Sequence, residues 1–141
     1  MDAEIDPTER RILGVLIEKQ LATPDAYPLS TRDVLVGCNQ KTCRDPVMNL
    51  QEWEVAGALA SLFDKKWATY VDGGRVRRWK HRVDERLSLT PTRLAALAEL
   101  LLRGAQPPKE LRRNADRLAR IPGDEEMWAI LDDLRARTPP L

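Results

Sequence analysis

The feature that most constrains the fold of this chain is a single β-hairpin pattern. Residues 67–71, WATYV, have the aromatic and β-branched composition of a strand, and Asp72-Gly73-Gly74 is a turn signal. Residues 75–83, RVRRWKHRV, then form a return strand. The patterns before and after the hairpin are helical, so the sequence predicts a mainly α protein with a small β-hairpin.

Three helical patterns precede the hairpin. Asp6-Pro7-Thr8-Glu9 combines a capping residue, a proline suited to the first helical position and a capping-box glutamate, and predicts a helix to about Leu21. A short helix is expected from Ser30, and a third from Asn49, with Asn49 as its cap and Glu52 reaching back. The first helix has one apolar stripe. The predicted inward-facing residues are Ile12, Leu13, Leu16, Ile17, Val34, Leu35, Cys38, Val55, Leu59, Leu62 and Phe63.

Three further helical patterns follow the hairpin. Thr90-Pro91 repeats the cap-then-proline start, and Gly104 ends that helix. Pro107-Pro108 opens the next helix, which Pro122-Gly123 breaks. Residues 124–126, DEE, start the last helix, where acids suit the positive end of the helix dipole.

Three helices followed by a hairpin is the order of a winged helix, whose third helix often enters the major groove of DNA. The hairpin of that fold, or wing, touches the DNA backbone. The second half repeats three helices, and residues 138–141, TPPL, end the chain where a wing would begin. We therefore predict two tandem winged-helix (helix-turn-helix) units, residues 1–84 and residues 85–141, the second without its wing. The connection near residues 84–88 is short, so the units are expected to pack together.

Three segments also resemble a known family. They are ILGVLIEK at residues 12–19, TPDAYPL at 23–29, and CNQKT at 38–42 followed by RDPVMNL at 44–50. Together they are similar to the YceH-like family of uncharacterised bacterial proteins, and the resemblance covers essentially the whole chain. It implies a fold of two tandem winged helices. Cys43 departs from the pattern, because the family usually has an asparagine there.

The loop between the second and third helices, residues 38–50, is rich in side chains that can form hydrogen bonds. Three interpretations stand. Its amides and Asp45 cap helix ends and hold a long turn rigid, or it binds a small ligand or peptide, or it adds Lys41 and Arg44 to a DNA-binding face. We favour the first. The loop residues that carry the family motif are Asn39, Gln40, Asp45, Pro46, Met48 and Asn49.

Positive charge is concentrated in the return strand. The chain has 23 Lys+Arg and 22 Asp+Glu, so with a net charge of +1 any attraction for nucleic acid must come from a local patch. The strand could contact phosphates, or it could be a solvated edge strand whose charges discourage pairing. Trp79 is expected in the core rather than stacked on a base. The residues assigned to nucleic-acid binding are Arg75, Arg77, Arg78, Lys80, Arg82, Lys65, Lys66, Lys41 and Arg44.

The sequence contains no motif that is typical of an enzyme active site. There is no Gly-rich phosphate loop or GxSxG elbow, and a histidine-based triad would rest on His81 alone. Cys38 and Cys43 are interpreted as small buried hydrophobic residues, because structural zinc needs four ligands. We predict no enzyme activity, no metal, no cofactor and no small-molecule ligand.

The compartment follows from composition. No apolar run approaches the ~20 residues of a membrane helix, and the acidic start MDAEIDPTER lacks the pattern of a secretory signal. Two cysteines are too few for a disulfide framework. We expect a cytoplasmic protein with reduced thiols and no membrane partner.

These patterns favour a non-enzymatic, transcription-associated accessory factor that contacts double-stranded DNA through the hairpin. The third helix weakens sequence-specific readout, because Glu52 and Glu54 in its first turn repel phosphate. The alternative is a protein-interaction or self-association scaffold, such as a dimer. An enzyme or ligand sensor that uses the 38–50 loop is the third hypothesis. Another helix could approach the small residues Ala56, Gly57, Ala60 and Ser61, which would suit the scaffold alternative. An ordinary exposed, alanine-rich face explains these residues at least as well.

Overall fold

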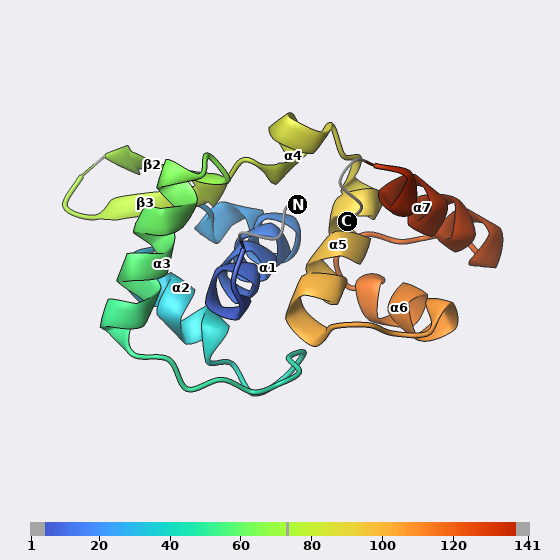
Figure 1. The fold of residues 1–141 in the computed structure, drawn as a ribbon, viewed down its shortest axis with the longest axis horizontal. Helices are drawn as coiled ribbons and strands as arrows, with labels where there is room; N and C mark the ends of the chain where they lie inside the picture. Colours follow the sequence, from blue (N-terminus) through green and yellow to red (C-terminus); the bar gives the residue numbers. More distant parts are fainter. Residues whose placement is uncertain (1–4, 73, 138–141) are drawn as a thin grey trace.

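The computed structural model describes residues 5–72 and 74–137. Helices make up most of this region, and the strands form one small sheet (Figure 1). The elements in chain order are α1 (Pro7–Ala22), the 3-10 turn η1 (Pro24–Ala26), β1 (Leu29–Ser30), α2 (Thr31–Cys38), α3 (Glu52–Asp64), β2 (Ala68–Asp72), β3 (Arg77–His81), α4 (Val83–Leu87), α5 (Pro91–Arg103), α6 (Pro108–Ala115) and α7 (Asp124–Ala136).

Helix α1 lies at the centre of the molecule. Its predicted capping box is confirmed: the Glu9 N–H donates to Asp6 Oδ1 at 2.8 Å, and the Asp6 N–H donates to Glu9 Oε1 at 3.1 Å. Every residue of α1 from Arg11 to Glu18 is buried. The prediction that α1 has a single buried face was therefore incomplete. Helices α2 and α3 and the strands cover one side of α1, and α5 covers the other (Figure 1).

Helices α1 and α5 approach each other closely. A Cβ atom placed on Gly14 would lie 2.8 Å from the Leu102 side chain. Gly14 is therefore a contact point for which only glycine leaves enough room. Buried apolar side chains from both halves of the chain form one continuous core around this contact.

The sheet is antiparallel with the strand order β1-β3-β2. The hairpin of β2 and β3 is confirmed, with Tyr70 opposite Trp79. The two-residue strand β1 was not predicted, and it places Leu29 beside Trp79 on the other edge of β3. Trp79 is 6% exposed, and its Nε1–H donates to Thr31 Oγ1 at 3.2 Å. The core position expected for this tryptophan is confirmed.

The start of the third helix was predicted wrongly. Helix α3 begins at Glu52 rather than Asn49, and the Gln51 N–H donates to Glu54 Oε1 at 3.0 Å. The reason lies eleven residues upstream, where the Asn39 side chain binds both backbone groups of Leu50: the Leu50 N–H donates to Oδ1 at 2.7 Å, and Nδ2 donates to the Leu50 carbonyl at 3.0 Å. This pairing occupies the backbone groups that an earlier helix start would use.

One expected core residue of α3 lies at the surface. Phe63 is 42% exposed, whereas Val55, Leu59 and Leu62 are fully buried as predicted. The Phe63 ring packs beside Tyr70 of β2, with 5.2 Å between the ring centroids. It covers the edge of the sheet rather than entering the core.

The second half consists of α4 to α7. Gly104 ends α5 with a positive φ of 82°, as predicted. Helix α6 ends at Ala115, earlier than expected, and a tight turn follows in which the Leu118 N–H donates to the Ala115 carbonyl at 2.9 Å. The predicted absence of a second wing concerns residues 138–141, which lie outside the described residues. Among the helices of residues 5–72 and 74–137, none has the length and apolar content needed to cross a bilayer.

Candidate functional site

The loop that carries the family motif, residues 38–50 and here named the motif loop, leaves α2, reaches the C-terminal end of α5 and returns to α3 (Figure 1). Its contact with α5 is a backbone hydrogen bond, in which the Asp45 N–H donates to the Leu102 carbonyl at 3.0 Å. The loop therefore joins the first half of the chain to the second.

Arg44 fixes the middle of the motif loop. Its side chain is fully buried, and Nη1 and Nη2 donate to the two carboxylate oxygens of Glu18 at 2.9 and 2.6 Å. Arg44 Nε donates to the Gly37 carbonyl at 3.1 Å. Burial opposes the ionisation of Glu18, but the hydrogen bonds and charge of Arg44, the hydrogen bond of Arg117 and the charge of Lys19 outweigh it and lower the pKa of Glu18 to about 2. The guanidinium of Arg44 is thus not offered to solvent, and we leave this residue out of the candidate nucleic-acid surface.

The ion pair between Arg44 and Glu18 extends, through Arg117, into the second half of the chain. Arg117 lies between two buried carboxylates, with Nη1 2.7 Å from Glu18 Oε2 and Nη2 2.7 Å from Glu99 Oε1. Arg103 Nε lies 3.2 Å from Glu99 Oε2. The resulting chain of charges connects the motif loop, α1, α5 and the turn after α6. We name Glu18, Arg44, Glu99, Arg103 and Arg117 the buried ion network after its buried carboxylates, although the Arg103 and Arg117 side chains are 27% and 32% exposed.

Arg11 binds the motif loop at two points, its first residue Cys38 and Pro46. Its side chain is buried and donates from Nη1 to the Cys38 carbonyl at 2.9 Å and from Nη2 to the Pro46 carbonyl. Cys38 itself is buried, and burial raises the pKa of its thiol to about 12, so the thiol stays protonated. These contacts agree with the interpretation that the loop is a rigid structural turn. The roles of Arg11 and Arg44 could not be read from the sequence, because both partners of Arg11 and the carboxylate partner of Arg44 lie 26 or more residues away.

Cys43 has a left-handed backbone, with φ of 61°. Asparagine enters this region more readily than other residues with a side chain, because its short amide can bond to the nearby backbone. The backbone at position 43 would therefore suit the asparagine that the resemblance implies there. Cys43 is partly exposed, so the expectation of a fully buried small residue holds for Cys38 and not for Cys43.

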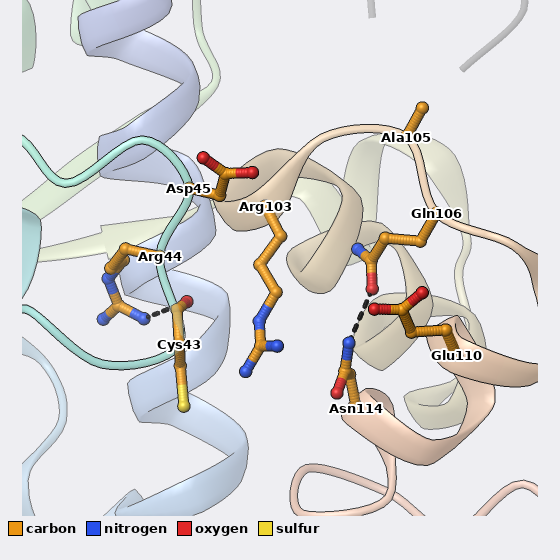
Figure 2. Close-up of a pocket in the computed structure, with 8 residues that line it drawn as sticks. All are labelled: Cys43, Arg44, Asp45, Arg103, Ala105, Gln106, Glu110 and Asn114. Carbon is orange, nitrogen blue, oxygen red and sulfur yellow. Dashed lines mark hydrogen bonds between the residues drawn. The ribbon is translucent and has the colours of Figure 1, made fainter.

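A polar pocket of about 230 Å³ opens between the motif loop and the α5–α6 connection (Figure 2). Most of its polar groups already have partners: Arg44 is bound to Glu18, and Asn114 Nδ2 donates to Gln106 Oε1 at 2.8 Å. Arg103 extends between the loop and this amide pair but is bound to Glu99. Among the lining side chains, the carboxylates of Asp45 and Glu110 form no hydrogen bond or ion pair within the described residues, so the unpaired groups of the pocket are acidic. Its lining consists of Cys43, Arg44, Asp45, Arg103, Ala105, Gln106, Glu110 and Asn114.

The predicted cations of the wing divide between the two faces of β3. Arg77 lies on the face of Trp79, with its guanidinium carbon 3.7 Å from the centroid of the Tyr70 ring and its Nε 3.5 Å from Asp72 Oδ1. Arg78 and Lys80 alternate with these residues and lie on the other face, opposite Val71 and Thr69 of β2. The alternation of a strand thus separates one stacked arginine from two cations on the outer face.

Three cations of the wing have no partner within the described residues. Arg75 and Arg78 are exposed and Lys80 is half-buried, and none of the three forms an ion pair in residues 5–72 and 74–137. We name Arg75, Arg78 and Lys80 the wing cations.

The other predicted cations are arranged differently. Lys65 Nζ lies 3.0 Å from both carboxylate oxygens of the buried Glu9, so its charge is used inside the protein. Arg82 lies 3.4 Å from Glu85. Lys66 is exposed with a φ of 67°, and Lys41 is exposed near the start of the motif loop. The structure therefore does not gather the nine predicted cations on one surface.

The outward face of α3 carries a tryptophan that the sequence interpretation did not consider. Trp53 is 75% exposed, and Ala56, Gly57 and Ala60 continue its face along the helix. The signal available in the sequence was the spacing of Trp53 from the small residues, three, four and seven positions. Beside the far end of this face lies a groove of about 370 Å³. The groove is lined by Thr31, Ala56, Ala60, Phe63, Asp64, Tyr70, Arg77 and Trp79.

Comparison with known proteins finds bacterial relatives. A family model described as "Protein of unknown function, DUF480" matches residues 5–141. A UPF0502 protein of Geotalea daltonii is 48% identical over 142 aligned positions, which cover 100% of this chain and 65% of that protein. UPF0502 proteins of Azoarcus sp. (strain BH72) and Burkholderia pseudomallei (strain 668) are 45% and 46% identical and are covered to 62% and 59% of their length, by 98% of this chain in each case. The chain thus spans less than two thirds of the length of these relatives.

Proposed function

Since the chain belongs to the DUF480 family, which includes the UPF0502 proteins, we propose that it is a non-enzymatic winged-helix protein of the YceH-like type that contacts double-stranded DNA through its wing. The elements of the first half support the winged-helix assignment. Helices α1, α2 and α3 precede the β2–β3 hairpin, and β1 completes a three-stranded sheet in the order β1-β3-β2.

The observation that carries the DNA proposal is the unpaired charge of the wing cations. Arg75, Arg78 and Lys80 have no carboxylate partner in the part of the chain that the structure describes, and the hairpin projects away from α6 and α7 (Figure 1). Such cations can neutralise phosphates and release counterions, which gives binding that weakens with salt. The contact is to the backbone, so we propose binding without strong sequence preference.

Helix α3 has a lesser part in this proposal. Its N-terminal turn carries the exposed Glu52 and the half-buried Glu54, and its outward face is apolar. Acids at this position repel phosphate, so readout of bases by α3 is not part of the proposed function.

The test is a DNA titration with a charge-matched control. The chain is titrated onto duplex DNA at ~50 and ~200 mM salt, and binding is expected to weaken steeply between the two. Reversing two wing cations, Arg75→Glu with Arg78→Glu, should weaken binding at low salt by at least ~10-fold. The control is Arg113→Glu with Arg120→Glu, which makes the same change in net charge at two exposed residues of the second half. Undetectable binding at low salt, or an equal loss in the control, would overturn the proposal.

A second candidate function is a protein-interaction scaffold. The observation that favours it is the exposed indole of Trp53 on the outward face of α3, beside three small residues and a groove with aromatic walls. Exposed apolar surface of this kind, rimmed by charges, often marks a site of protein association.

A further inference from the structure

The outward face of α3 has a large side chain at one end and a groove at the other. Trp53, 75% exposed, lies at the N-terminal end, and Ala60 and Phe63 border the groove at the C-terminal end. Between them Ala56 and Gly57 are exposed. Gly57 has no heavy atom within 4 Å of the place where a Cβ would be, so the backbone of α3 is bare at this point.

The positions along this face are symmetric about its middle. Trp53 precedes Ala56 by three residues, and Ala60 follows Gly57 by three residues. We propose that α3 pairs with α3 of a second copy of this chain, antiparallel and about a two-fold axis between Ala56 and Gly57. In this register Trp53 lies against the partner's Ala60 and enters the partner's groove. The contact is isologous, so both grooves are filled at once.

The charges at the ends of the face favour the antiparallel arrangement. Glu52 is exposed next to Trp53, and Arg77 lines the groove at the other end. An antiparallel pair brings Glu52 toward the partner's Arg77 at both ends. A parallel pair would instead set Glu52 and Glu54 beside the same acids of the partner, which is repulsive.

The groove suits one side chain of a partner better than a small molecule. Its volume of about 370 Å³ is at the low end for a ligand site, and it is wide open beside an exposed helix. Its walls, Phe63, Tyr70 and Trp79, are aromatic, and buried tryptophans in such pockets are frequent anchors of protein interfaces.

The pairing leaves the outer face of the wing free. Arg78 and Lys80 alternate with the groove residues Arg77 and Trp79 and lie on the opposite face of β3. A dimer would therefore present two wings. This inference rests on the scaffold candidate for α3 and is independent of whether the wing contacts DNA, because DNA binding and self-association are measured separately.

The first test measures the mass of the chain by sedimentation velocity up to ~0.1 mM protein. We expect a monomer–dimer equilibrium that Gly57→Gln shifts to monomer, because the new side chain separates the helices. The space around Gly57 is open, and glutamine favours a helix over glycine, so the melting temperature of the monomer should not fall. Trp53→Ser should weaken the dimer by ~30-fold or more, whereas Trp128→Ser, at a tryptophan of α7 that is 49% exposed, should leave it unchanged.

The second test reverses charges. Glu52→Arg and Arg77→Glu should each weaken the dimer, and the double variant should recover it, because the pair is restored with opposite signs. Three results would overturn the proposal: a wild-type chain that is monomeric at every concentration, a dimer that persists in Gly57→Gln, or an equal loss of dimer in Trp53→Ser and Trp128→Ser.

Discussion

His81, the single histidine of the chain, is 3% exposed and has a partner for each ring nitrogen. The Val83 N–H donates to Nδ1 at 3.0 Å, so the proton of the neutral ring is on Nε2, where it faces Gln20 Oε1. Burial lowers the pKa of His81 to about 4, and the nearby Asp84 carboxylate only partly opposes this shift. The residue is a structural link between β3 and α1, which its place in a basic strand did not reveal.

Stability should therefore fall in a defined range of pH. The unfolded chain binds a proton at His81 below a pKa of about 6.5, whereas the folded chain does so only near 4, so stability is lost as pH falls from 6.5 to 4. Each pKa unit corresponds to about 1.4 kcal/mol, and the expected loss is about 3 kcal/mol.

The matched variant is His81→Asn, whose amide oxygen can still accept from the Val83 N–H but does not titrate. Urea unfolding at several pH values should give a flatter profile between pH 6.5 and 4 for the variant than for the wild type. The further loss below pH 4.5, which comes from protonation of Glu18, should remain in both. Identical profiles above pH 4.5 would contradict this assignment.

At the scale of elements, the sequence predicts what is local. Capping residues, prolines and Gly104 marked the helix ends of α1 and α5 correctly, because each acts within a few residues of itself. The start of α3 was missed because Asn39, eleven residues away, binds the backbone of Leu50. The structural role of Arg44 is not predicted for the same reason, because its partner Glu18 is 26 residues away. From the sequence alone, Arg44 resembles a surface cation.

The motif loop should depend strongly on Arg44. Arg44→Met leaves Glu18 buried with one partner fewer, and the Gly37 carbonyl keeps only the longer hydrogen bond from the Gln40 N–H at 3.4 Å. Removing one member of a buried ion pair costs about 3–5 kcal/mol, and we expect this loss in the free energy of unfolding measured with urea.

The control for this variant is Arg113→Met, an exposed arginine with no ion pair among the described residues, which should change stability by no more than about 0.5 kcal/mol. A change of similar size in both variants would show that the buried ion network does not hold the loop.

At the scale of the whole molecule, the decisive feature is that α1 is buried on every side. The apolar spacing of Ile12, Leu13, Leu16 and Ile17 predicted correctly that these four residues are buried. Gly14 and Val15 lie off that stripe, and they are buried because α5 and α2 approach α1 there. Which helix covers a second face depends on contacts between distant segments, so it could not be predicted from periodicity.

Substitution of two mid-helix glycines, Gly57 and Gly14, should distinguish the effect of packing on stability from that of helix propensity. At protein concentrations where the chain is monomeric, Gly57→Ala should raise the free energy of unfolding by about 0.5–1 kcal/mol, because its surroundings within one chain are open and alanine favours a helix. Gly14→Ala makes the same chemical change but brings Cβ to within 2.8 Å of the buried Leu102 side chain. Overpacking of this kind costs about 1–3 kcal/mol, so we expect a net loss of stability in urea unfolding. A gain in both variants would show that the α1–α5 contact can relax.

The position of α1 bears on how the molecule could be dissected. A cut in the connection near residues 84–88 would leave α1 with the first fragment and remove α5 from it. The fragment would then expose Gly14 and its neighbours to water and keep Glu18 without Arg117. The second fragment would lose the helix against which α5 packs and would hold Glu99 and Arg117 without Glu18. Although the boundary between the two halves of the chain lies near residue 84, neither fragment would have a complete hydrophobic core.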